Sequence, residues 1–353
     1  LEARRQEAQF PDALGDVRVG DHVVGRGGAG KEAPGEKAHV IAARSSRGQH
    51  EDARAGGRCV VLLLEHRVHG EGRRRLLRPR DHLGDAVILT LASFPARREV
   101  DSLQLGRIGG ALQYARHTRP FDGDPHTMAV GPVTIDIAEP FRRIHLRVAE
   151  VPESPVAMDI TFTARTAAYA LRRGTMKAGH ELIWDQSHMV QSGEYTGWFR
   201  HGGKTVSVDG WWGQRDHSWG IRDHARCPMW QWFAIQLPDG MIGGWHWEYP
   251  NGARVFTDGC FAPVGGADPI PVIDYRHDLH WLDANGGRTS YGRDGENVHG
   301  LEGRLEFTLE GGRRIGVEGR GTWAARYGPY GGGQNLLAVR TDDGREGIAI
   351  HEI

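Results

Sequence analysis

The stretch from Val208 to Arg222 carries the side chains with the clearest potential for chemistry. It places Asp216 and His217 among three tryptophans and two arginines. A carboxylic acid enclosed by aromatic rings can stay protonated, because burial disfavours the charged form. Such an acid can protonate an electron-rich alkene, and aromatic faces can stabilise the carbocation that results. We therefore take Asp216 and His217 as candidate catalytic residues.

The arginines of this stretch leave a structural alternative open. Arg215 or Arg222 could pair with Asp216 or Asp223 and fix the strand to the end of a barrel. An arginine within reach of a carboxyl group favours its ionised form, which cannot act as a general acid. The position of the arginines relative to Asp216 therefore distinguishes the hypothesis of an enzyme from that of a non-catalytic domain.

The tryptophans are concentrated in one part of the chain, since all eleven lie between residues 184 and 323. Side chains alternate between the two faces of a strand, so Trp230 and Trp232 share a face. Residues 245–249 put three aromatic rings on one face and His246 with Glu248 on the other. These faces either fill a barrel core or line a cavity for a hydrophobic molecule. The candidate ligand-binding residues are Trp211, Trp212, Trp219, Trp230, Trp232, Trp245, Trp247 and Tyr249, with Arg215 and Arg222 orienting the site.

The elements that must position these residues are short β-strands. From Val87 onward apolar and polar residues alternate, for example over residues 133–137, 144–148 and 301–310. Alternation with a period of two is typical of antiparallel strands with one buried face. Turn signals such as Asn285-Gly286 separate the strands. The pattern predicts an all-β barrel or sandwich.

Residues 1–85 differ from the rest, because Phe10 is their only aromatic residue and residues 59–64 their only marked apolar run. Such a segment buries too little surface to offset its ordering entropy. We expect a non-domain segment, either disordered or translated out of frame. It contains a G-x-x-x-x-G-K match at residues 25–31, but Glu32 replaces the magnesium-binding Ser or Thr and Pro34 interrupts the helix that should follow.

The composition excludes several classes of partner. Lys and Arg number 44 against 45 Asp and Glu, which gives no basic footprint for nucleic acid, and no apolar run is long enough for a membrane span. The three cysteines favour a reduced, cytoplasmic chain. Although there are 19 histidines, no H-x-H or H-E-x-x-H motif is present, so we expect no metal and no cofactor.

The string G-x-R-D-H-S-W-G-x-R, residues 213–222, resembles a bacterial branch of the superfamily that includes AttH-like proteins and carotenoid 1,2-hydratase. That superfamily is similar in fold to lipocalin-like tocopherol cyclases and fungal Diels–Alderases. The resemblance spans about residues 103–353. It implies two consecutive lipocalin-like antiparallel β-barrel domains, 86–222 and 223–353, with a ligand cleft at or between them. The hydratase branch reads W-x-D-R-E-W, so Asp216 and Trp219 match it, whereas His217 and Ser218 do not.

Residues and resemblance together lead to two functional hypotheses. The first is cofactor-free acid catalysis on a hydrophobic terpenoid-, steroid- or polyketide-like molecule, by hydration, cyclisation or isomerisation. Such an enzyme would be a hydro-lyase or an isomerase. The second is a non-catalytic carrier of a lipophilic metabolite.

Overall fold

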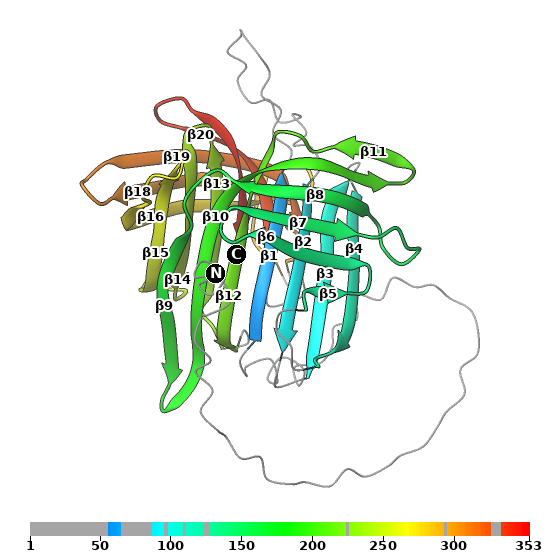
Figure 1. Ribbon diagram of the computed structural model, residues 1–353. Coiled ribbons are helices and arrows are strands. Elements are labelled where there is room, and N and C mark those ends of the chain that lie inside the picture. The colour runs from blue at the N-terminus through cyan, green and yellow to red at the C-terminus, as the bar shows by residue number, and fades with distance from the viewer. Residues whose placement is uncertain are drawn as a thin grey trace.

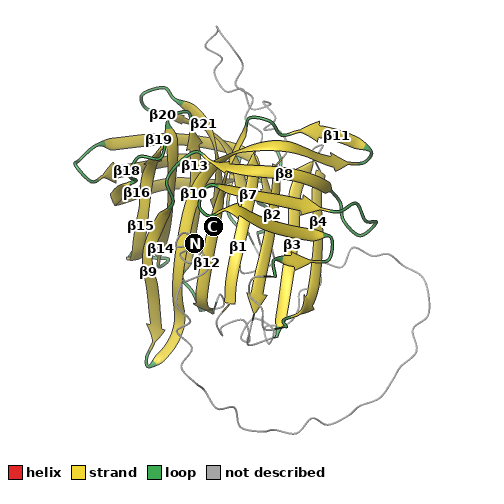
Figure 2. Cartoon of the chain, viewed as in Figure 1, coloured by secondary structure: helices red, strands yellow, loops and turns green. Residues whose placement is uncertain are grey.

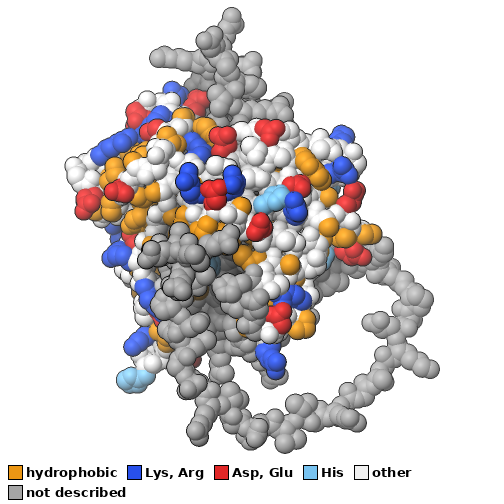
Figure 3. Space-filling view, in the orientation of Figure 1, with side chains coloured by type: hydrophobic (Ala, Val, Ile, Leu, Met, Phe, Trp, Pro, Cys, Tyr) orange, Lys and Arg blue, Asp and Glu red, His pale blue; other side chains and the backbone are white. Residues whose placement is uncertain are grey.

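The computed structural model describes residues 56–64, 86–94, 98–108, 111–122, 127–223, 226–292, 295–325 and 333–353. Every regular element in these ranges is a β-strand (Figures 1 and 2), which confirms the all-β prediction. No helix of the described residues is long and apolar enough to cross a membrane. The G-x-x-x-x-G-K match at residues 25–31 lies outside these ranges. Basic and acidic side chains are interspersed on the face seen in Figure 3, as the balanced composition predicts.

The first domain is a sheet of 12 described strands that rolls around its own core. Ser102 Oγ donates to Val130 O over 3.4 Å and Arg119 Nε to Ala129 O over 2.8 Å, which brings the short strand β5 against β3 and β4 at the other edge. The strands follow one another in the order β4 (Ala111–Pro120), β3 (Glu99–Ile108), β2 (Ala86–Phe94), β1 (Gly56–Leu64), β12 (Trp211–Arg222), β10 (Glu181–His201), β8 (Ala157–Ala164), β7 (Arg143–Val148), β6 (Val133–Glu139) and β5 (Ala129–Val130), with β9 (Tyr169–Ala178) and β11 (Lys204–Ser207) also paired to β10.

Strand β1 lies within residues 1–85, which the sequence analysis expected to be a non-domain segment. Its residues pair antiparallel with β2 on one side and with β12 on the other, Val60 lying opposite Thr90 and Asp216. The strand contains the one apolar run of that segment, residues 59–64. Apolar runs of this length are typical of strands in the middle of a sheet. The remaining residues up to 85 lie outside the described ranges.

The second domain is an antiparallel sheet in which eight of the described strands close into a barrel through the pairing of β15 with β16. The interior contains the aromatic residues Phe233, Tyr275 and Phe307. The architecture confirms the lipocalin-like fold. The strands are β13 (Met229–Leu237), β14 (Gly240–Glu248), β15 (Arg254–Pro263), β16 (Ile270–Leu282), β17 (Arg288–Thr289), β18 (Gly300–Leu309), β19 (Arg314–Ala325), β20 (Gln334–Thr341) and β21 (Glu346–Glu352).

The two domains meet through an apolar interface formed by their outer faces. Strand β9 also lies against β15, where the Tyr169 hydroxyl donates to Asp258 Oδ1 over 3.2 Å. The last strand of the first sheet ends at Arg222, and the first strand of the barrel begins at Met229. We call the apolar residues packed between the sheets the interface cluster; its members on the strands that matter here are Trp184 and Val190 of β10, Trp232 and Ala234 of β13, and Met241, Trp245 and Trp247 of β14.

Candidate functional site

Strand β12 holds the two candidate catalytic residues on opposite faces, because they are neighbours in an extended chain. Asp216 faces the second domain, together with Gln214, which hydrogen-bonds Gln236 of β13. His217 faces the other way, with its ring centroid 5.3 Å from that of Trp219. The structure therefore does not bring Asp216 and His217 together in one site.

The partner of Asp216 is a histidine that the sequence analysis missed. Asp216 Oδ2 lies 2.6 Å from His188 Nε2, and the two side chains are only 9% and 7% exposed. The antiparallel register of β10 and β12 places Val190 opposite Asp216, so that His188 lies diagonally across from it. The His188 ring is nearly parallel to that of Trp232, with centroids 6.3 Å apart, and makes a T-shaped contact with Trp245, with centroids 5.6 Å apart. An acid–base pair is thus enclosed by indoles where the two domains meet.

Neither arginine of the motif forms an ion pair with Asp216. Arg215 lies on the opposite face, where its Nε donates to Gln191 Oε1 over 3.0 Å. Arg222 Nη2 donates to Ser218 Oγ over 3.1 Å. Among the described residues the carboxylate of Asp216 bonds to His188, so neither Arg215 nor Arg222 anchors Asp216.

A carboxyl group and an imidazole at hydrogen-bond distance can pass a proton between them or to a bound molecule. The other polar atoms of the pair, Asp216 Oδ1 and His188 Nδ1, are buried and make no hydrogen bond with protein atoms in the described part of the chain. A buried polar atom without a partner costs about 1–3 kcal/mol. Both atoms are thus suited to hydrogen-bond a bound molecule.

Further buried polar atoms belong to residues next to the pair, two of them on the same faces of β10 and β12 as His188 and Asp216. Gln186 precedes His188 by two residues on β10, and Gln214 precedes Asp216 by two residues on β12. Gln186 Oε1, Gln214 Nε2 and Trp232 Nε1 are buried without a hydrogen-bond partner in the described ranges. Native interiors contain few such atoms, so those near the pair make its surroundings a candidate binding region.

The candidate ligand-binding residues divide into two groups. Trp230, Trp232, Trp245 and Trp247 come together at the interface, joined by Trp184, which the sequence analysis did not select. The spacing of Trp184, Gln186 and His188 at every second residue of one strand was the available signal. The other four candidates lie elsewhere: Trp211 packs on Phe199 inside the first domain, Trp212 under Arg165, Trp219 beside His217, and Tyr249 is 49% exposed past the end of β14.

The interface tryptophans are not equivalent. Trp247 is fully buried, and its ring lies 4.4 Å from Trp245 and 5.5 Å from Trp184. A methyl group at Gly174 of β9 would come within 2.6 Å of it, so Trp247 belongs to a solid core. Trp232 and Trp245 instead border the pair. A surface pocket of about 370 Å³ lies at the other end of β10 near Arg200 and includes neither member of the pair.

His217 should make the unfolding free energy of the protein depend on pH. Burial, and after it the nearby charge of Arg215, lowers the pKa of His217 from 6.5 to about 4. The folded protein therefore holds this imidazole neutral, while the unfolded chain binds a proton below about pH 6.5. The stabilisation is fully present above that pH and is lost as the pH falls towards 4. Between pH 7 and pH 4 the unfolding free energy of the wild type should therefore fall by about 2–3 kcal/mol more than that of His217→Gln, which lacks this imidazole.

Chemical unfolding at both pH values checks this prediction. His180→Gln, at an exposed turn position between β9 and β10, should follow the wild type and serves as the control. An identical pH dependence for His217→Gln and the wild type would contradict the assignment.

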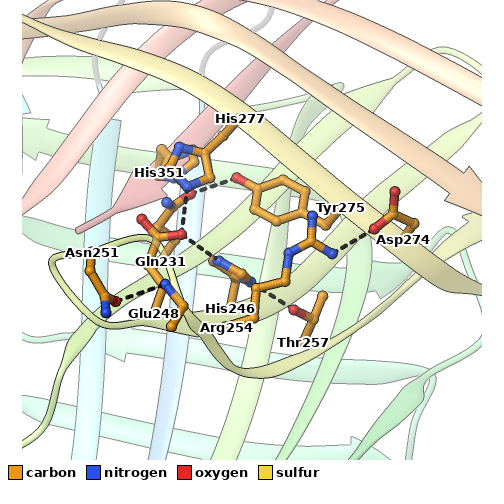
Figure 4. Close-up of polar contacts among 11 residues, drawn as sticks. Gln231, His246, Glu248, Asn251, Arg254, Thr257, Asp274, Tyr275, His277 and His351 are labelled. Atoms are coloured by element: carbon orange, nitrogen blue, oxygen red, sulfur yellow. Dashed lines mark hydrogen bonds and ion pairs between the residues drawn. The ribbon is translucent and has the colours of Figure 1, made fainter.

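A second polar group lies inside the barrel. His246 and Glu248 of β14 and His277 of β16 place three potential ligand atoms within 4.8 Å of one another (Figure 4). The sequence analysis put His246 and Glu248 on one face and expected no metal site. The third residue comes from a strand that begins 22 residues after Glu248, so only the barrel closure reveals the cluster.

Comparison with solved structures identifies the fold. A protein of Nitrosomonas europaea assigned as AttH matches with a TM-score of 0.56 at 11% identity, covering 86% of this chain and 93% of that one. CghA, solved with Sch210972, matches with a TM-score of 0.53 at 11% identity, covering 84% and 87%. Kievitone hydratase of Nectria haematococca matches at 0.49 and 13% identity, covering 85% and 89%. The first two confirm the AttH-like fold predicted from the sequence.

Sequence comparison places the chain in a family. No curated protein matches it. A family model described as a family of unknown function, DUF8625, matches residues 84–285, which is more than half of the 353 residues. The chain belongs to the family DUF8625.

Proposed function

We propose that this protein binds a hydrophobic terpenoid-, steroid- or polyketide-like molecule beside the Asp216–His188 pair and rearranges it by cofactor-free proton transfer. The observation that carries the proposal is the buried 2.6 Å contact between Asp216 Oδ2 and His188 Nε2, enclosed by Trp232 and Trp245. Exclusion of water from such an apolar site keeps a transferable proton from leaking to solvent before it reaches a bound alkene.

The reaction follows from what the pair can give and take back. The carboxylic acid of Asp216 donates its proton to one alkene carbon, forming a C–H bond and leaving a cation on the other carbon. Trp232 and Trp245 present π-faces that stabilise this cation without trapping it. Addition of water and return of one proton to the pair completes a hydration. Loss of a different proton completes an isomerisation, and attack by a second alkene followed by proton loss completes a cyclisation.

Two further observations support the proposal. The buried acceptor Asp216 Oδ1 and the imidazole atom His188 Nδ1 offer hydrogen bonds that would orient a polar group of the substrate. CghA, which shares the fold, has been solved with Sch210972. A small molecule in a protein of this fold fits a binding role at the domain interface.

Native mass spectrometry of freshly purified full-length protein, with extraction and identification of the bound species, tests the binding step. We expect one apolar molecule per chain, with occupancy reduced in Trp232→Ala because that indole borders the pair. Trp281→Ala is the matched control, since Trp281 lies on β16 and contacts Tyr291 instead. Equal occupancy in both variants would place the molecule elsewhere and contradict the proposed site.

A further inference from the structure

We infer that His246, Glu248 and His277 form a binding site for a divalent transition-metal ion of the zinc class at the mouth of the barrel. This inference is independent of the proposed function. His246 and His277 lie against Tyr275 of the barrel interior (Figure 4). His188 of the Asp216–His188 pair lies instead against Trp232 and Trp245 of the interface cluster.

The ligand atoms converge on one oxygen of Glu248. His246 Nε2 lies 3.0 Å and His277 Nε2 3.1 Å from Glu248 Oε2. In a tetrahedral zinc site, with bonds of about 2.0–2.1 Å, neighbouring ligand atoms are about 3.3 Å apart. Both nitrogen–oxygen distances are within a few tenths of an ångström of that value, and all three ligand atoms lie within 4.8 Å of one another.

A residue beside the cluster is placed to select the required form of His246. Its Nδ1 lies 2.7 Å from Thr257 Oγ1. When Nδ1–H donates to that hydroxyl, the lone pair of Nε2 faces the carboxylate oxygen of Glu248. Two acceptors then face each other, and a cation between them removes the repulsion. A hydrogen bond from the far nitrogen of a histidine ligand is the usual support of zinc sites, so Thr257 is a positioning residue.

The surroundings suit a metal with an open coordination position. His246 is buried, whereas the side chains of Glu248 and His277 are 17% and 21% exposed, so water can complete the coordination. The nearby positive charge, Arg254, is paired with Asp274 at 2.6 Å and is thereby compensated. Two imidazoles and one carboxylate favour zinc-class ions over calcium or magnesium, which prefer oxygen ligands. Three protein ligands with an open fourth position are typical of catalytic zinc sites.

Cobalt(II) titration of chelator-treated full-length protein, followed by zinc(II) displacement, tests the site without any assay of activity. We expect visible d–d absorption that saturates at one Co²⁺ per chain and disappears on adding Zn²⁺. Glu248→Gln and His277→Gln should weaken Co²⁺ binding more than about 10-fold, and Thr257→Val by about 10- to 100-fold. His280→Gln is the control, because His280 lies on the same strand β16 but pairs with Asp278.

The outcomes separate a metal site from a hydrogen-bonded cluster. A folded wild type that gives no saturable absorption overturns the inference, as do Glu248→Gln and His277→Gln variants that bind like the wild type. Near-UV circular dichroism verifies that each variant is folded. If His277→Gln does not fold, Glu248→Gln decides the matter, because its side chain is partly exposed and the change is nearly isosteric. A failure here leaves the proposal for Asp216 and His188 untouched, because neither residue is altered.

Discussion

A chain that begins at Ala86 should be unable to fold its first domain. The deletion removes β1, which pairs with β12 over Gly56–Leu64 and with β2 over residues 57–64. Without it, β2 and β12 are left as open edges in the middle of the sheet, and strands β2–β4 are separated from the rest. At about 1 kcal/mol for each backbone hydrogen bond lost, the cost is comparable to the whole stability of a domain, about 5–15 kcal/mol.

Thermal unfolding followed by circular dichroism measures this effect. A chain beginning at Gly56 retains every strand that the structure describes and is the matched control. We expect that shorter deletion to keep a cooperative transition and the deletion to residue 85 to lose it for the first domain. If the chain beginning at Ala86 instead unfolds cooperatively within a few degrees of the control, β1 contributes nothing and the domain begins at residue 86.

The sequence predicted the elements better than their pairing. Alternation over Val133–Glu139 or Gly300–Leu309 directly reports a strand with one buried face. Strand β1 escaped prediction because it is a short apolar run inside a segment of Gly, Arg and charged residues. Its position in the middle of the sheet depends on β12, whose paired residues lie 148 to 164 positions later in the chain, and a local pattern cannot show such a contact.

The candidate site shows the same limit. Asp216 stood out because of its unusual neighbours, yet His188 lies 28 residues earlier and is brought to it only by the register of β10 and β12. His217 was selected for its proximity in sequence, although adjacent residues of a strand face opposite sides. The same rule placed the tryptophans of β13 and β14 on shared faces, as the structure has them. Applied to β12, it would also have put Trp211 and Trp219 on the face opposite to Asp216.

Replacing Asp216 by Asn should abolish turnover while leaving binding intact. Asn has almost the shape of Asp and can still hydrogen-bond His188, but it has no acidic proton to deliver. Loss of a general acid costs about 100- to 10,000-fold in rate. Asp185→Asn is the matched control, because Asp185 lies on β10, the strand of His188, but its carboxylate binds Arg173 at 2.6 Å and points away from the pair. That control should retain wild-type turnover.

The most direct test of the proposed site is the rate at which wild type, Asp216→Asn and Asp185→Asn convert the molecule that co-purifies with the protein, followed by mass spectrometry of substrate and product. We predict conversion by the wild type and by Asp185→Asn. For Asp216→Asn we predict undiminished binding of the molecule with turnover at least about 100-fold slower. Full turnover by Asp216→Asn would contradict the assignment of the acid. Release of the molecule unchanged by the wild type would instead identify the protein as a carrier.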